Sequence, residues 1–107
     1  MIKEVTVVRR RWLRGTGLGR LRDKSGKQCC LGFLARACGY KAKEIIDLSD
    51  LTDLIIRWDE LERRFGVTFA QMSTIYWEND NEELSDQERE EVLIHLFAES
   101  GITLNFK

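Results

Sequence analysis

The chain contains no proline, one histidine and three cysteines. Without proline, helices can run uninterrupted and folding has no slow prolyl isomerisation step. No apolar run approaches the roughly 20 residues of a membrane-spanning helix, so no membrane partner is expected. The first residues are not followed by the apolar core of a signal peptide, and an odd cysteine count is typical of free thiols. We therefore expect a protein of the reducing cytoplasm.

Charged residues are plentiful but unevenly placed along the sequence. The 107 residues, 43% of them apolar, can fill one hydrophobic core, so a single domain over residues 1–107 is expected. The net charge is −1, yet residues 1–43 carry twelve Lys or Arg against two acids, and residues 44–107 carry five against sixteen. Such asymmetry indicates either two halves that neutralise each other on packing or contact with a charged partner.

The first half of the sequence predicts one strand and two short helices. β-branched residues dominate residues 2–8, which favours a strand. The nearly all-apolar segment 31–38 predicts a buried helix that Gly39 ends, and a second short helix is expected over 41–47. Turn-forming residues also predict a hairpin. The shorter elements expected are a helical turn over 9–14 and a hairpin that pairs 18–22 with 26–30 across a turn at 23–26.

The middle of the sequence is harder to assign. Apolar residues recur at helical spacing over 51–65, which predicts one amphipathic helix ended by Gly66. Residues 67–77 mix β-branched and aromatic side chains and favour a strand. The same residues also fit one face of a helix, so a helix is the alternative. A polar loop is expected over 78–83.

The C-terminal third of the sequence has the clearest local signals. Ser85 and Glu88 form a capping-box pattern, which predicts a helix that closes at Gly101. Alternating apolar and polar residues over 102–106 predict a final, half-buried strand. Together these elements predict a small α+β domain, in which a three- or four-stranded, mostly antiparallel sheet packs with three or four helices.

The cysteines are the first candidates for chemistry. Cys29 and Cys30 are adjacent and Cys38 follows two helical turns later, a spacing unlike the C-x2-C pairs of zinc sites. A thiolate nucleophile needs a base, and His95 is the one histidine available. Packing of small thiols in a core explains the same residues. A zinc site, a Cys-dependent enzyme and core packing stay open here, and we predict no metal, no cofactor and no catalytic residue.

A cluster of arginines directly follows the first strand. Arginine beside an aromatic side chain can bind phosphate and stack on a base, so the cluster is a candidate nucleic-acid interface. The glycines at 15, 17 and 19 lack the spacing of a phosphate-binding loop, and the net charge is slightly negative rather than basic. The residues of this alternative are Arg9, Arg10, Arg11, Trp12 and Arg14.

An acidic segment spans residues 78–91. Its carboxylates and amides are suitable calcium ligands, but the EF-hand spacing is absent. A solvated loop with helix capping is the simplest interpretation, and an acidic patch that docks a basic partner is the other. Aromatic residues are enriched at interface hot spots, and two of them directly precede the segment. The predicted partner-binding residues are therefore Tyr76, Trp77, Asp80, Glu82 and Glu83.

Several short blocks are spread over most of the chain: W-L-R-G from 12, C-C-L-G from 29, N-D from 79, R-E from 89, L-F from 96 and G-I from 101. In these blocks the sequence resembles a group of small uncharacterised phage and prophage proteins, whereas residues 40–72 match poorly. The resemblance implies an accessory protein of the bacterial cytoplasm and transfers no catalytic residue. We expect a protein that binds and modulates a host protein, as an anti-defence inhibitor does. The sequence predicts no particular oligomeric state.

Overall fold

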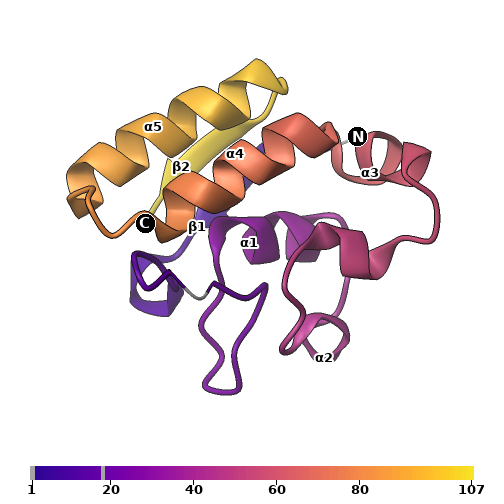
Figure 1. Ribbon diagram of the computed structural model, residues 1–107, viewed down its shortest axis with the longest axis horizontal. Coiled ribbons are helices and arrows are strands. Elements are labelled where there is room, and N and C mark those ends of the chain that lie inside the picture. Colours follow the sequence, from indigo (N-terminus) through magenta and orange to yellow (C-terminus); the bar gives the residue numbers. More distant parts are fainter. Residues whose placement is uncertain (1, 18) are drawn as a thin grey trace.

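The computed structural model describes residues 2–17 and 19–107, which form an α+β fold of five α-helices and a pair of short strands (Figure 1). No helix within these residues is long and apolar enough to cross a membrane. The 3-10 turns η1 and η2 complete the set. In chain order the elements are β1 (Glu4–Val7), η1 (Arg9–Arg11), α1 (Cys30–Ala37), α2 (Ala42–Ile45), η2 (Leu51–Leu54), α3 (Asp59–Phe65), α4 (Phe69–Asp80), α5 (Asp86–Glu99) and β2 (Thr103–Phe106).

The sheet differs from the predicted one. β1 and β2 pair in parallel, with Val5 opposite Leu104, so the prediction of three or four mostly antiparallel strands was wrong. The inner strands are missing from the described residues because 67–77 is largely helical and the residues around 23–26 stay in loops. The predicted first and last strands do form. Both alternate as expected, with Val5, Val7 and Leu104 buried against the core.

The segment before α1 is a set of loops rather than a hairpin. The predicted turn forms, and the Asp23 carboxylate accepts hydrogen bonds from the N–H groups of Ser25 and Lys27, both at 2.9 Å. Across the turn, the N–H of Asp23 donates to the carbonyl of Lys27 at 2.8 Å and the N–H of Cys29 to that of Arg20 at 3.2 Å, but the described residues of these arms form no strand ladder with each other. Isolated bridges join Trp12 to Gln28 and Arg22 to Ile46. The hairpin prediction also included Leu18, which lies outside the described residues.

The helix predicted over 51–65 is broken into η2 and α3. Asp50 caps η2 by accepting a hydrogen bond from the N–H of Thr52 at 2.8 Å. Ile55 is then extended, with φ −124° and ψ 159°. The Glu60 carboxylate accepts the N–H of Ile56 at 3.2 Å, so α3 begins only at Asp59. The prediction of one continuous helix over 51–65 was therefore wrong between Ile55 and Trp58. Trp58, which the helical spacing placed on the buried face, is 67% exposed.

Most of the segment 67–77 is helical, so the prediction of a strand was wrong and the alternative of a helix is confirmed. Thr68 accepts a hydrogen bond from the N–H of Gln71 at 3.1 Å, and the Gln71 side chain accepts the N–H of Thr68 at 2.9 Å. This reciprocal capping box starts α4. The helix then continues to Asp80, into the region predicted as a polar loop.

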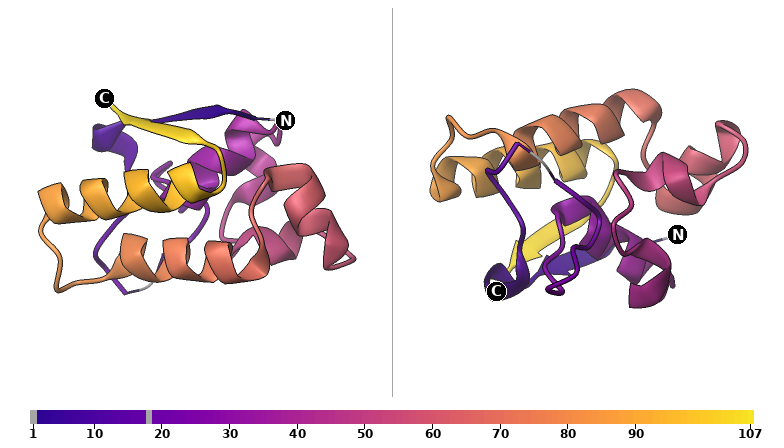
Figure 2. Two further views of the ribbon diagram at one scale, coloured as in Figure 1. Left: turned by 90° about the horizontal axis from the view of Figure 1, so that it is seen from above. Right: turned by 60° about the horizontal axis from the view of Figure 1, so that its bottom comes forward.

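α1 and α5 form a middle layer between the sheet and α4. α1 contacts β1 and α4, and α5 contacts β2 and α4. Figure 2 shows the paired strands and α4 on opposite sides of α5. α5 begins at the predicted capping box, where Ser85 accepts the N–H of Glu88 at 3.1 Å. The largest side chains buried in this core are Trp12, Phe65, Phe97, Leu21, Leu31 and Leu34.

Candidate functional site

The C-terminal end of α4 holds a buried amide that joins three segments of the chain. Asn79 is 1% exposed. Its Oδ1 accepts hydrogen bonds from Trp12 Nε1 at 2.9 Å and from the backbone N–H of Cys30 at 3.1 Å. Its Nδ2 donates to the carbonyl of Leu13 at 3.0 Å and to Asp80 Oδ1 at 2.9 Å. The amide thus uses both donors and both lone pairs of its oxygen inside the protein.

The glycine-rich loop is fastened to the same helix end. The N–H of Gly15 donates to the carbonyl of Asn79 at 3.0 Å, and the N–H of Gly17 donates to that of Asp80 at 3.3 Å. The N–H of Gly19 donates to Asp80 Oδ2 at 3.1 Å. A Cβ at position 19 would overlap the Asp80 carboxylate, so glycine is needed there. The W-L-R-G, C-C-L-G and N-D blocks therefore meet at one junction and hold the loops against α4.

Beside this junction the surface is hollowed, and the cavity measures about 400 Å³. We call it the acidic hollow. All five predicted partner-binding residues line it, which their positions in the sequence alone do not reveal. The sequence indicated Gly17 only as part of a phosphate-binding loop and the Asn81 amide only as a calcium ligand, so neither was predicted to contact a partner. The lining residues are Gly17, Tyr76, Trp77, Asp80, Asn81, Glu82 and Glu83.

The side chains of the acidic hollow differ in how free they are. Trp77 is 71% exposed. Glu82 and Glu83 are exposed, and neither side chain forms an ion pair within residues 2–17 and 19–107. Asp80 is only 8% exposed, and burial raises the pKa of its carboxyl against the opposing effect of the hydrogen bonds it accepts. Burial also raises the pKa of the Tyr76 phenol, and the nearby Asp80 carboxylate adds to this shift.

The predicted nucleic-acid residues are mostly engaged within the protein. Arg9 makes two hydrogen bonds to the Glu90 carboxylate, at 2.7 and 2.8 Å, and Arg14 reaches Asp86 at 2.9 Å. The Trp12 ring is 2% exposed and lies under the Arg14 guanidinium, 4.6 Å from it, so it is not available to stack on a base. In the described residues of the chain, the exposed arginines of this cluster whose side chains form no hydrogen bond or ion pair are Arg10 and Arg11.

The cysteines pack as core residues. Burial raises the pKa of Cys29 to about 12, and it raises the pKa of Cys30 well above its ordinary value. Burial also raises the pKa of the half-buried Cys38. The side chain of His95 is 81% exposed and lies 4.0 Å from Glu99. Among the described residues, no three His, Cys, Asp or Glu side chains group as a metal site. A thiolate is stabilised by nearby positive charge and partial exposure, whereas Cys29 and Cys30 are buried.

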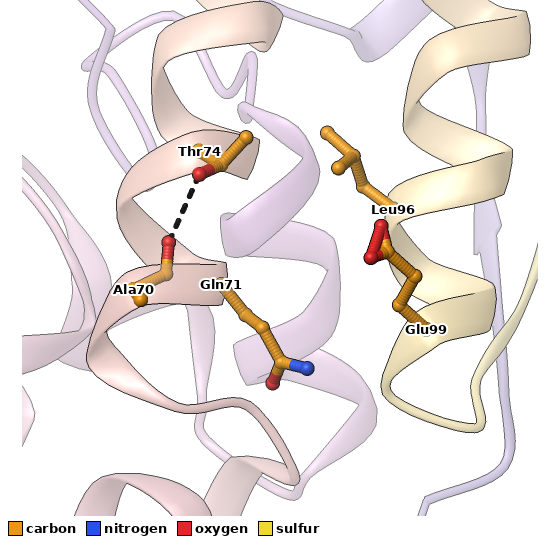
Figure 3. A pocket seen from close by; sticks show the side chains of 5 residues that line it. All are labelled: Ala70, Gln71, Thr74, Leu96 and Glu99. Carbon is orange, nitrogen blue, oxygen red and sulfur yellow. Dashed lines mark hydrogen bonds between the residues drawn. The ribbon is translucent and has the colours of Figure 1, made fainter.

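Another hollow, of about 230 Å³, lies between α4 and α5. In Figure 3, Gln71 and Thr74 from α4 face Leu96 and Glu99 from α5 across it. The hydroxyl of Thr74 donates to the carbonyl of Ala70 at 3.0 Å, within its own helix. Glu99 is the one ionisable group in its lining, so no set of charges converges there. The acidic hollow is the better candidate site.

Known proteins offer no template for this site. No protein-family model, no curated protein and no solved structure matches the chain. The candidate site is therefore defined by its own geometry: an exposed indole, a half-buried phenol and three carboxylates around one cavity beside the end of α4.

Proposed function

We propose that this protein is a non-catalytic, phage-type accessory protein that binds a basic segment of a host protein, such as a defence protein, in the acidic hollow. The observation that supports this most directly is the placement of Trp77 beside Glu82 and Glu83 around one cavity. An indole face attracts a cation, and carboxylates accept charge-assisted hydrogen bonds from Lys or Arg. A basic side chain of a partner matches both features at once.

The exposure of Trp77 strengthens this proposal. A tryptophan that is 71% exposed contributes little to the core. Tryptophan is among the residues that dominate binding energy at protein interfaces, especially when a partner shields it from water. The neighbouring Glu82 and Glu83 form no ion pair with the residues that the structure describes, so a partner does not have to break such a pair to reach them. The site is thus ready to bind without rearranging the fold.

Nucleic acid is the second candidate, and it rests on Arg10 and Arg11. Two unpaired arginines neutralise about two phosphates, which gives a salt slope of about −2 and is shallow for a nucleic-acid-binding protein. The carboxylates of the acidic hollow repel phosphate. A Cys-dependent enzyme has less support, because burial raises the pKa of Cys29 and Cys30.

The test is a pull-down from bacterial lysate, treated with nuclease, that compares Trp77→Ala with Trp58→Ala. The two indoles are matched, since Trp77 is 71% exposed and Trp58 is 67% exposed, but Trp58 lies outside the hollow and contacts Phe69. The wild type and Trp58→Ala should retain the same host protein. Trp77→Ala should retain it at least about tenfold less, because truncating a hot spot costs about 2 kcal/mol.

Two outcomes contradict the proposal. Equal retention by Trp77→Ala and Trp58→Ala would place the contact outside the acidic hollow. Retention that disappears on nuclease treatment, and that is lost in the Arg10→Ala/Arg11→Ala double variant, would make nucleic acid the ligand.

A further inference from the structure

A second cavity, of about 450 Å³, adjoins the acidic hollow. The two share Glu82, whose Oε1 lies close against Gly17 at the boundary between them. Three cationic side chains line the second cavity, from three different segments: Arg14, Lys27 and Arg89. We call it the basic hollow.

The cations of the basic hollow are only partly neutralised. Asp86 lies between two guanidinium groups, accepting from Arg14 at 2.9 Å and from Arg89 at 2.6 Å. One carboxylate thus serves two cations. Lys27 is exposed and forms no ion pair with any residue that the structure describes. With Glu82 counted, the lining still carries one more positive than negative charge.

Arg89 gives an independent sign that the basic hollow suits an acceptor. It is 2% exposed, and its Nη2 donates to the carbonyls of Asn81 and Leu84 at 2.6 and 2.9 Å. Its Nε is also buried but has no hydrogen-bond partner among the described residues. Because the carboxylate that pairs with this buried guanidinium is shared with Arg14, an anion in the basic hollow would add stabilising negative charge.

We propose that the basic hollow binds a carboxylate of the same partner segment that places its cation in the acidic hollow. This inference rests on the proposed function and makes it more specific. The segment carries a Lys or Arg and, one or two residues from it, an Asp or Glu. Charge complementarity favours this order of charges, since adjoining cavities of opposite charge match opposite charges on neighbouring residues of an extended chain.

The test uses short peptides and follows the three indole N–H signals of the protein by NMR at low ionic strength. The probes are N-acetylated, C-amidated glycine peptides with a central Arg, either alone or with an Asp one or two residues to either side. Lys27→Ala is compared with Lys24→Ala, which removes the same charge from the same loop but lies outside both hollows. The Trp77 signal reports binding in the acidic hollow, and the Trp58 signal, from a residue that lines neither hollow, serves as the reference. Trp12 lines the basic hollow, so its signal is followed as a second reporter and not as a reference.

The best Asp-containing peptide should bind the wild type and Lys24→Ala about threefold more tightly than the peptide with Arg alone, as expected for one exposed ion pair. Lys27→Ala should bind both peptides equally. Equal binding of all peptides by the wild type, with the Trp77 signal still shifting, would overturn this inference and leave the acidic hollow as a cation site. If no Arg peptide shifts the Trp77 signal, the acidic hollow itself is not such a site.

Discussion

Two sides of the same helix end behave in opposite ways. On the inner side of α4, Asn79 is 1% exposed and every polar atom of its side chain is bonded within the protein. On the outer side, two residues earlier, Trp77 is 71% exposed and lines the same cavity as Glu82 and Glu83, which form no ion pair within the described part of the chain. The inner residues hold the fold together, whereas the outer residues have no evident structural role. The outer side is therefore where binding is expected.

The inner side also explains the short blocks of the sequence. Trp12, Gly15, Cys30 and Asn79 come from blocks that are far apart in the chain, and they meet through hydrogen bonds at the junction. A pattern that looks like a functional motif can thus be a structural one. Function has to be sought in the neighbouring residues that the junction leaves free.

Asn79→Ala should have the largest effect on stability. The substitution leaves Trp12 Nε1 and the N–H of Cys30 buried without an acceptor, so we expect the free energy of unfolding to fall by about 3–4 kcal/mol. Urea denaturation measures this change. Asn105→Ala, on the exposed face of β2, is the matched control and should change it by less than about 0.5 kcal/mol. A similar loss in both variants would mean that the junction is not a special point of the fold.

Asp80 and Asp86 should respond to pH with opposite signs. Burial raises the pKa of Asp80 in the folded state, so Asp80 costs stability once pH rises above the unfolded value of about 4. The hydrogen bond from Arg14 lowers the pKa of Asp86, so its stabilisation is present above that value and is lost as pH falls through and below it.

Urea denaturation between about pH 2 and pH 7 tests this, because that range spans the ordinary carboxyl pKa values. As pH rises, the wild type should lose stability relative to Asp80→Asn and gain it relative to Asp86→Asn. The prediction fails if the stability difference between wild type and Asp80→Asn and that between wild type and Asp86→Asn change with pH in the same direction.

Trp77→Ala should have the smallest effect on stability. Its ring is mostly exposed, so the free energy of unfolding should change by no more than about 0.5 kcal/mol. The same denaturation experiment used for Asn79→Ala gives the answer. A loss as large as that of Asn79→Ala would mean that Trp77 is a structural residue, and the contrast between the two sides of α4 would disappear.

Local signals in the sequence predicted the elements whose ends they define. Ser85 and Glu88 mark the start of α5. α1 ends at Ala37, and Gly39, two residues later, has a positive φ of 102°. The same kind of signal at Thr68 and Gln71 marks α4, but the prediction of a strand over 67–77 rested on β-branched and aromatic composition and did not use that signal. The capping pair proved to be the stronger guide, because it satisfies backbone groups that any helix start must satisfy.

The rest depends on contacts between distant residues. Pairing of β1 with β2 joins the two ends of the chain, and no local pattern specifies a parallel neighbour. The acidic residues of the candidate site were identifiable from composition. Their unequal exposure was not, because the burial of Asp80 depends on Gly19, far away in the sequence. Sequence reasoning thus named residues that line one cavity without predicting the shape of that cavity.

The pairing of β1 with β2 has a consequence for synthesis of the protein. Glu4 has its partner at Thr103, so β1 leaves the ribosome long before its neighbour exists. At about 5–20 residues per second, β1 waits roughly 5 to 20 s as an unpaired strand edge. Lys3, Glu4 and Thr6, which are exposed beside it, protect that edge, since charged and polar side chains discourage pairing with other chains. Until β2 emerges, the newly made chain therefore carries an edge that can mispair with other chains.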